Sequence, residues 1–538
     1  MKHFILLVSL LSGLSPAFAQ KKTTAPAKPK LVVGIIVDQM RDEYLHRFSG
    51  KFSSGGFKRM MGEGFTCRNN HYHYASTVTG PGHTHVFTGS SPAISGIVGN
   101  DWYEKPIGKE MYVASDSTVS LVGEGKASAG KMSPRNLKVT TITDQLRVAT
   151  QFRSKVVGVA FKDRGAIMPA GHTGQAYWFD GSSANWITST YYRNELPQWV
   201  KDFNARKLPA EYTAQKWEYL FPDYDYAESE DDDQPYEAAL SGEKSAIFPH
   251  TLTSESFTTS YFSSKLTREF AMAAVENENL GGGPVTDFLT ISFSGPDYAG
   301  HAFGPQSKEI QDVYLRLDRE IEQLLNYLDK KLGKGTYTVF LSADHAVANI
   351  PAFNMKNNIP AGVFIGKELQ RLAQRALEKR YGDSKMVEFY DNYQVYLNRE
   401  VMAKRNLTID EITETLQSEL SLKEGIYTVV NIAEGKVNSV PEYYQKKLTN
   451  LYNPKRSGEI MILPEPAWFE GGVKGTTHGT MYSYDTHVPL LFFGWGVNHG
   501  ETVRPTYISD IAPTVAMLLK ILEPNGSMGA PIQEVLKK

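Results

Sequence analysis

The feature that most constrains the fold is a set of uninterrupted apolar, β-branched runs, each of which stops at polar residues. These runs occupy residues 31–37, 156–161, 288–293 and 336–341. Amphipathic helical patterns lie between them at 142–150 and 308–332, and another lies near the end of the chain at 509–522. Runs without polar alternation are typical of strands buried on both faces, as in parallel sheets covered by helices. The alternation therefore predicts an α/β fold, a doubly wound, mostly parallel sheet flanked by helices.

Two regions interrupt this alternation. Residues about 170–280 are rich in Tyr, Trp, Ser and Pro, and residues about 350–475 carry charged helical stretches at 367–381 and 409–420. We interpret both regions as insertions that form a cap or rim on one catalytic domain spanning residues 31–538. The acidic run at 228–233 is interpreted as a solvated loop rather than a cation site.

The first residues have the parts of a secretory signal peptide. Lys2 is followed by an apolar run from 4 to 14 and by Ala17-Phe-Ala19, so residues 1–19 are predicted to direct export and to be cleaved. The apolar run is shorter than the roughly 20 residues that a membrane-spanning helix needs. Residues 20–30, rich in Lys, Pro, Ala and Thr, are predicted to form a flexible leader.

Composition excludes some classes of partner. The chain carries 57 basic and 59 acidic residues, which gives no general attraction to nucleic acid or to an anionic membrane. No segment after the first is long and apolar enough to predict stable membrane insertion. The single cysteine, Cys67, is predicted to be buried, and internal disulfides are absent. Nothing in the composition specifies an oligomeric state.

Six potential metal ligands follow the predicted strands or stand in a stretch of small residues. They are Asp38, Asp297, His301, Asp344, His345 and His478. Because the carboxyl ends of parallel strands meet at one edge of a sheet, we expect these side chains to converge. Three carboxylates would repel one another unless cations lay among them, and this nitrogen and oxygen set suits zinc. The histidines without this setting are interpreted as structural or surface residues: His46, His71, His73, His250 and His499.

Thr79 is the candidate nucleophile. Residues 77–89 have the pattern of a turn that enters a helix, and free backbone N–H groups at such a position favour phosphate. A hydroxyl bound to zinc loses its proton readily and becomes a competent nucleophile. The alternative is that Thr79 merely caps the helix, and spacing alone leaves both interpretations open.

These motifs, in this order from residue 31 to the C-terminal helix, resemble the alkaline phosphatase superfamily. They are most similar to its nucleotide pyrophosphatase/phosphodiesterase branch and, within it, to the bacterial periplasmic, phosphate-irrepressible alkaline phosphatases that use threonine. The resemblance implies two zinc ions (Zn2+), and an attack by Thr79 that forms a phosphothreonine. It implies that Asp297, His301 and His478 hold the zinc near the leaving group, whereas Asp38, Thr79, Asp344 and His345 surround the other zinc.

A basic pair is predicted to select small-molecule phosphate monoesters. On an extended segment Lys162 and Arg164 would project to the same side, where they can meet two oxygens of one phosphoryl group. Asp163 would point away. A monoester dianion carries more charge on those oxygens than a diester does. The resembling phosphatases have this pair and an asparagine, which corresponds to Asn100 in Gly99-Asn-Asp-Trp-Tyr. The alternative for the pair is an ordinary solvated strand end.

Three other functions compete with a periplasmic phosphomonoesterase. A phosphodiesterase or nucleotide pyrophosphatase would share the metal ligands and Thr79 but would offer a lipid or nucleoside pocket instead of the basic pair. A sulfatase needs a Cys/Ser-x-Pro-x-Arg motif, which Cys67-Arg-Asn-Asn does not match. A zinc-dependent binding protein would have no use for a nucleophile beside a positive clamp.

Overall fold

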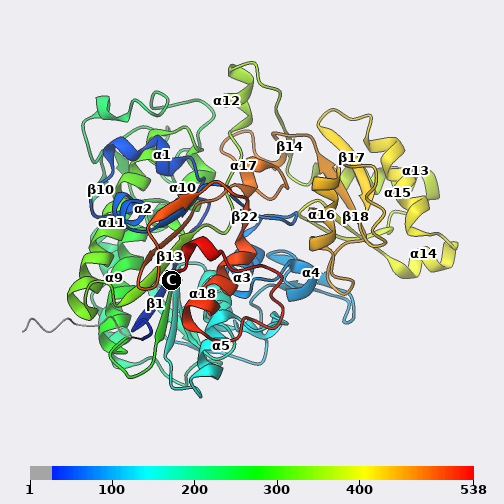
Figure 1. The fold of residues 1–538 in the computed structure, drawn as a ribbon. Helices are drawn as coiled ribbons and strands as arrows, with labels where there is room; N and C mark the ends of the chain where they lie inside the picture. Colours follow the sequence, from blue (N-terminus) through cyan, green and yellow to red (C-terminus); the bar gives the residue numbers. More distant parts are fainter. Residues whose placement is uncertain (1–26, 538) are drawn as a thin grey trace, which may run out of the picture.

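A computed structural model describes residues 27–537, and its centre is a ten-stranded sheet (Figure 1). In spatial order the strands are β21 (Gly500–Thr502), β2 (Phe65–Cys67), β20 (Leu490–Gly494), β13 (Tyr337–Ser342), β1 (Leu31–Val37), β12 (Asp287–Phe293), β7 (Val156–Ala160), β8 (Gln175–Asp180), β9 (Asn185–Ser189) and β6 (Leu121–Val122). The five neighbours from β13 to β8 run parallel, and antiparallel pairs flank them. The predicted mostly parallel α/β fold is confirmed.

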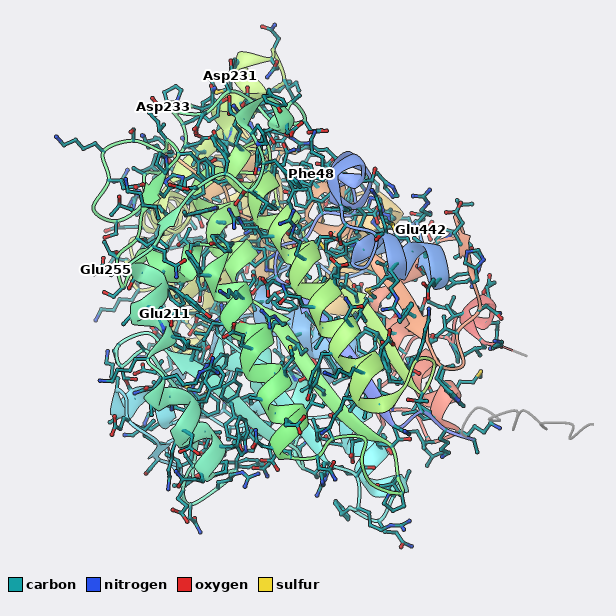
Figure 2. All side chains as sticks on the ribbon, turned by 90° about the vertical axis from the view of Figure 1, so that its left-hand side faces the viewer. Phe48, Glu211, Asp231, Asp233, Glu255 and Glu442 are labelled. Atoms are coloured by element: carbon teal, nitrogen blue, oxygen red, sulfur yellow. The ribbon has the colours of Figure 1, made fainter. Side chains whose placement is uncertain are left out.

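Helices cover both faces of this sheet (Figure 1). On one face lie α9 (Phe262–Asn277) and α11 (Lys308–Leu332), and on the other lie α3 (Thr79–Thr88), α5 (Ile142–Ala149), α6 (Asp163–Ala170) and α18 (Ile511–Leu519). Figure 2 looks onto the face where the long helices α9 and α11 run side by side. The helix predicted at 308–332 has those bounds because Ser307 caps its first turn and Gly333, with φ +102, ends it.

Residues 362–471, here called the second lobe, form a smaller unit beside the main body (Figure 1). Its four-stranded sheet has the order β15 (Val387–Asp391), β16 (Gln394–Leu397), β18 (Ile460–Pro464) and β17 (Ile426–Asn431), packed with α13 (Glu368–Tyr381), α14 (Arg399–Arg405), α15 (Ile409–Leu420) and α16 (Glu442–Leu451). The buried Arg456 ties the lobe to the main body. Its guanidinium donates to the carbonyls of Gly96 and Asn136, each at 2.7 Å, and pairs with Glu104 at 2.8 Å.

The structure corrects the assignment of residues 170–280 to an insertion. β8 and β9 belong to the main sheet, and α9 covers that sheet. The aromatic residues that suggested an irregular region instead fill the core at this edge, where Trp186 stacks on Phe270 with ring centroids 4.0 Å apart. The inserted material is therefore confined to residues 190–261, with the short helices α7 (Gln198–Ala205) and α8 (Leu208–Thr213).

The acidic run 228–233 is only partly the solvated loop that was predicted. Asp231 and Asp233 are exposed, and Figure 2 shows both at the upper edge of the molecule. Glu228, by contrast, pairs with Lys51 at 2.6 Å, and Glu230 pairs with Lys356 at 3.0 Å. The ion pairs of Glu228 and Glu230 thus attach the acidic run to the main body.

The signal peptide predicted at 1–19 and most of the leader lie outside the described residues. Between residues 27 and 537, no helix combines the length and the apolar character that crossing a membrane requires. Cys67 is buried as predicted, and burial raises the pKa of its thiol from 9.0 to about 12. At neutral pH this thiol is therefore protonated and unreactive.

Close contact between α3 and β1 depends on Gly34. A Cβ added there would lie 2.6 Å from Phe340 on β13 and 3.0 Å from Phe87 on α3. Both rings are buried in the main core, so they have little room to move. The glycine therefore fixes how closely α3, which begins at Thr79, approaches the sheet.

We predict that Gly34→Ala destabilises the protein by about 1–3 kcal/mol through overpacking. Urea unfolding at a fixed metal concentration measures this. Gly62→Ala is the matched control, because an added Cβ on α2 (Phe57–Glu63) meets no atom within 4 Å; it should be neutral or stabilising. Equal stability of the Gly34→Ala variant and the unmodified chain would contradict the packing argument.

Candidate active site

All six predicted ligands lie together at the carboxyl ends of β1, β12 and β13. Asp38 follows β1, and Asp344 and His345 follow β13. Directly after β12, α10 (Gly295–Phe303) carries Asp297 and His301. His478 comes from the loop after β19 (Trp468–Gly471). Within residues 27–537, two sets have ligand atoms that all lie within 4.8 Å of one another: Asp297 with His345 and His478, and Asp38 with Asp344 and His345. His301 joins the first set, because its Nε2 lies 3.2 Å from Asp297 Oδ1.

The three histidines are oriented as metal ligands are. In each ring Nδ1 faces a backbone carbonyl: His301 faces Thr476 at 2.8 Å, His478 faces Thr77 at 2.8 Å, and His345 faces Ala346 at 3.0 Å. A hydrogen bond from Nδ1–H fixes the tautomer and leaves the Nε2 lone pair free. The rings of His345 and His478 stack with centroids 3.4 Å apart, and both histidines belong to one of the two candidate ligand sets.

Charge in this crevice is unbalanced. Burial, and then the neighbouring Asp297 and Asp344, raise the pKa of Asp38 well above its usual value. Lys162 Nζ lies 2.7 Å from Asp38 and 2.5 Å from Asp297. Burial alone would raise the pKa of Asp297, but the attraction of Lys162 and then His301 holds it well below its usual value.

Buried atoms without partners show where cations fit. Asp38 Oδ1 and His345 Nε2 are buried and have no hydrogen-bond partner within residues 27–537. Burying such atoms unpaired is costly. A divalent cation would satisfy them and would offset the repulsion between the carboxylates. The chemistry of this donor set therefore fits bound metal.

Thr79 is the first residue of α3 and is almost fully buried. Val78 occupies the N-cap position, and no side chain caps this helix, so the alternative in which Thr79 is a cap is wrong. Its Oγ1 instead accepts a hydrogen bond from Arg164 Nη2 at 3.4 Å. Gly82 makes this placement possible, because a Cβ there would lie 2.1 Å from the carbonyl oxygen of Asp344.

Of the three predicted phosphate contacts, Arg164 reaches Thr79 and Asn100 binds the next residue, Gly80. Lys162 contacts Asp38 and Asp297 instead, and one local prediction about the basic pair is wrong. Lys162 is extended, with φ −75 and ψ 127, whereas α6 begins at Asp163 and Arg164 is helical. The pair therefore meets at the site through a strand-to-helix turn and not along an extended segment. Asn100 Oδ1 accepts from the backbone N–H of Gly80 at 2.7 Å, so the amide nitrogen is the group of this side chain that can donate to a phosphate.

Asp163 points away from Thr79, toward Tyr112. The Tyr112 hydroxyl donates to the Asp163 carboxylate, and Arg164 Nη1 lies 3.2 Å from the same hydroxyl. The tyrosine therefore contacts the same guanidinium that reaches Thr79 and helps to position it.

Sequence reasoning missed two residues that support the site. His83 Nδ1 lies 3.0 Å from the carbonyl of Thr79 and 3.3 Å from Asp344 Oδ2, while its Nε2 is 2.8 Å from Ser292. Gln39 donates from its side chain to Asp297 at 2.8 Å and from its backbone N–H to Asp344 at 3.2 Å. The spacing of His83, four residues after Thr79 on the predicted helix, is a signal that could have found it.

A parallel α/β sheet with two metal-ligand sets and a buried threonine at its carboxyl edge is the architecture of a metal-dependent hydrolase. The family model for type I phosphodiesterase / nucleotide pyrophosphatase matches residues 32–487. The chain therefore belongs to that family.

Two relatives match over the full chain. The alkaline phosphatase PafA of Elizabethkingia meningoseptica is 45% identical over 545 residues, covering 99% of both chains. The alkaline phosphatase PhoV of Synechococcus elongatus is 41% identical over 559 residues, covering 100% of both. At this identity and coverage the likeness extends to the whole protein, and this chain is an enzyme.

The fold also matches solved structures. The crystal structure of wild-type PafA superposes with a TM-score of 0.92 at 44% identity, covering 96% of this chain and 100% of that one. A PafA T79S, N100A, K162A, R164A mutant gives a TM-score of 0.91 at 45% identity. The sheet and its helices are therefore those of an alkaline phosphatase-like enzyme.

Removal of divalent ions with a chelator should inactivate the protein and lower its melting temperature, because the carboxylates would then be left unbalanced. A ligand at about 100 times its dissociation constant contributes about 2.7 kcal/mol, so thermal unfolding measures the effect apart from turnover. Adding divalent ions back should restore both quantities. An unchanged melting temperature after complete removal of metal would contradict the metal-site assignment.

Proposed function

We propose that this enzyme hydrolyses phosphate monoesters to an alcohol and inorganic phosphate through a covalent phosphothreonine on Thr79, at a site that holds two zinc ions. The observation that carries this proposal is the placement of Thr79. Its buried hydroxyl lies 3.4 Å from the guanidinium of Arg164. Thr79 itself is on α3, the helix that packs against the backbone of Asp344. Likeness to PafA and PhoV over the full chain supports the monoester class.

The choice of zinc rests on the donor set. Three imidazole nitrogens and three carboxylates suit zinc better than magnesium, which prefers oxygen ligands in octahedral geometry. Asp297, His301 and His478 would hold one ion, and Asp38, Asp344 and His345 would hold the other beside Thr79. Two such ions, when bound, lower the pKa of a hydroxyl and neutralise charge on the attacking and leaving oxygens.

The residues of the chain supply positioning and charge. Thr79 Oγ1 attacks phosphorus in line, the bond from phosphorus to the ester oxygen breaks, and the alcohol leaves. Arg164 and the free amide nitrogen of Asn100 donate to oxygens of the transferred phosphoryl group, which holds it against Thr79. Water then hydrolyses the phosphothreonine, which releases inorganic phosphate and regenerates the hydroxyl.

Preference for monoesters follows from the two fixed positive charges, Lys162 and Arg164. A dianionic phosphoryl group gains more from both charges than a diester does. The solved PafA mutant combines T79S, N100A, K162A and R164A, which are the residue types and numbers of the four positions proposed here. The runner-up is a phosphodiesterase or nucleotide pyrophosphatase, which the family model favours.

We further propose a periplasmic location. The positive start, apolar run and Ala-x-Ala pattern of residues 1–19 support export. A metal-dependent phosphatase acting there would meet phosphate esters outside the inner membrane.

We predict that Thr79→Ala lowers kcat for an aryl phosphate monoester by at least about 10³-fold, because no nucleophile remains. Zinc content, measured by elemental analysis, should stay near two ions per chain. Thr88→Ala is the matched control, since within residues 27–537 its hydroxyl bonds Thr84 and Ser90 alone, near the end of the same helix. Retained turnover in Thr79→Ala would contradict the assignment of Thr79 as the nucleophile.

Replacement of both Lys162 and Arg164 by Ala should lower kcat/KM for a monoester roughly 10²-fold or more beyond the loss for a matched diester, because each charged contact contributes about 1.5–3 kcal/mol. Steady-state kinetics on both esters, with zinc content checked, gives the comparison. An equal loss on the two esters would remove the argument for the monoester class and would favour the diesterase alternative.

A further inference from the structure

The tip of the β15–β16 hairpin adopts a conformation that one of its two residues does not favour. Asp391 pairs with Gln394, so Asn392 and Tyr393 form a two-residue loop with φ +46 and φ +65. Such loops require positive φ at both positions, which suits Asn and Gly but is strained for a tyrosine. Tyr393 is buried, and its hydroxyl accepts from the backbone N–H of Glu470 at 3.4 Å. Backbone strain that the surrounding structure maintains is typical of functional sites, so the hairpin tip is a candidate for a functional role.

The side chain of Asn392 lies between the two segments that flank Thr79. Its Nδ2 would be 3.4 Å from a Cβ on Gly99, the residue before Asn100. Its Oδ1 would be 3.8 Å from a Cβ on Gly479, the residue after His478. The second lobe therefore places one amide beside both the phosphate-contact segment and the metal-ligand segment.

Contacts between β15 and β4 of the main body fix the position of the hairpin. Phe389 on β15 stacks with Tyr103 on β4 (Asp101–Glu104) at a centroid distance of 6.4 Å, and the Tyr103 hydroxyl lies 3.3 Å from Glu388. β4 begins directly after Asn100. Together with the buried Arg456, these contacts hold the tip in register with the phosphate contacts.

The surroundings of the amide accept hydrogen bonds. Asn392 Nδ2 donates to Asp391 at 2.5 Å, which turns Oδ1 away from that carboxylate. Oδ1 has no hydrogen-bond partner among residues 27–537, and the side chain is half-buried, so solvent reaches it. Burial, and then the nearby Asp101, raise the pKa of Asp391 to about 7. A hydrogen-bond donor placed here would find two acceptors, Asn392 Oδ1 and the carboxylate of Asp391.

We propose that Asn392 forms a subsite for the leaving alcohol and accepts a hydrogen bond from a donor group on its carbon chain, so that the enzyme favours esters of hydroxylated or amino alcohols over simple alkyl esters. This inference rests on the proposed function, because Thr79, Asn100 and Arg164 must hold the phosphoryl group for the alcohol to extend toward His478. Asn392 is then a determinant of specificity for the alcohol and not for the phosphoryl group.

The test compares kcat/KM for glycerol 1-phosphate, 2-aminoethyl phosphate and propyl phosphate. Asn392→Gly removes the amide but suits φ +46, so the hairpin backbone is retained. The ratio of the two donor-bearing esters to propyl phosphate should fall about three- to tenfold, the effect of one hydrogen bond. Asn406→Gly is the matched control, because Asn406 ends α14 of the same lobe with φ +53 and is exposed.

The two donor-bearing esters separate the possible groups. A fall for glycerol 1-phosphate alone assigns the subsite to hydroxyl groups, and a fall for 2-aminoethyl phosphate alone assigns it to ammonium groups; both support the proposal. Equal losses on all three esters, unchanged ratios, or the same shift in Asn406→Gly overturn it. Failure of the proposed function is distinguishable, because Thr79→Ala would then retain turnover on every ester, whatever Asn392→Gly does to the ratios.

Discussion

Three buried carboxylates in one crevice determine what the rest of this structure must provide. Asp38, Asp297 and Asp344 are each almost inaccessible to solvent, and each lies just beyond a different parallel strand. Lys162 meets two of them directly, which offsets only part of their mutual repulsion. Divalent cations would complete the balance. In the proposed function the same cations would supply the charge that phosphoryl transfer needs, so the stability of the crevice and its chemistry would have one origin.

Close packing of the backbone around the crevice determines where Thr79 lies. Glycines at positions 34 and 82 let α3 lie directly against β1 and against the backbone of Asp344. A side chain at either position would push the helix outward and carry Thr79 with it. His83 then joins the helix to Asp344 and to Ser292 on β12. The position of Thr79, the proposed nucleophile, is thus set by rigid elements, which favours a well-defined geometry for attack.

Much of this site could be predicted from the sequence because its signals are local. An apolar run followed by Asp or Asp-His marks both a buried strand and its functional end, and the strands at Asp38, Asp297 and Asp344 lie where those runs predicted. The helix that carries Arg164 was missed because Gly165 and Pro169 weaken its pattern. β8 and β9 were assigned to an insertion since aromatic composition does not distinguish an edge of the core from an irregular segment. The supporting contacts of Gln39 are long-range and have no local signature.

Specificity lies beyond the reach of such local signals. In the proposed function, residues with a recognisable spacing in the sequence bind the phosphoryl group, whereas the proposed subsite for the alcohol lies among residues 99, 392 and 479, which only tertiary structure brings together. A strained hairpin and the buried Arg456 are needed to bring the second lobe to that point. A change in this lobe would therefore alter discrimination between alcohols without disturbing the charges around Thr79, because the proposed contacts lie on the alcohol side.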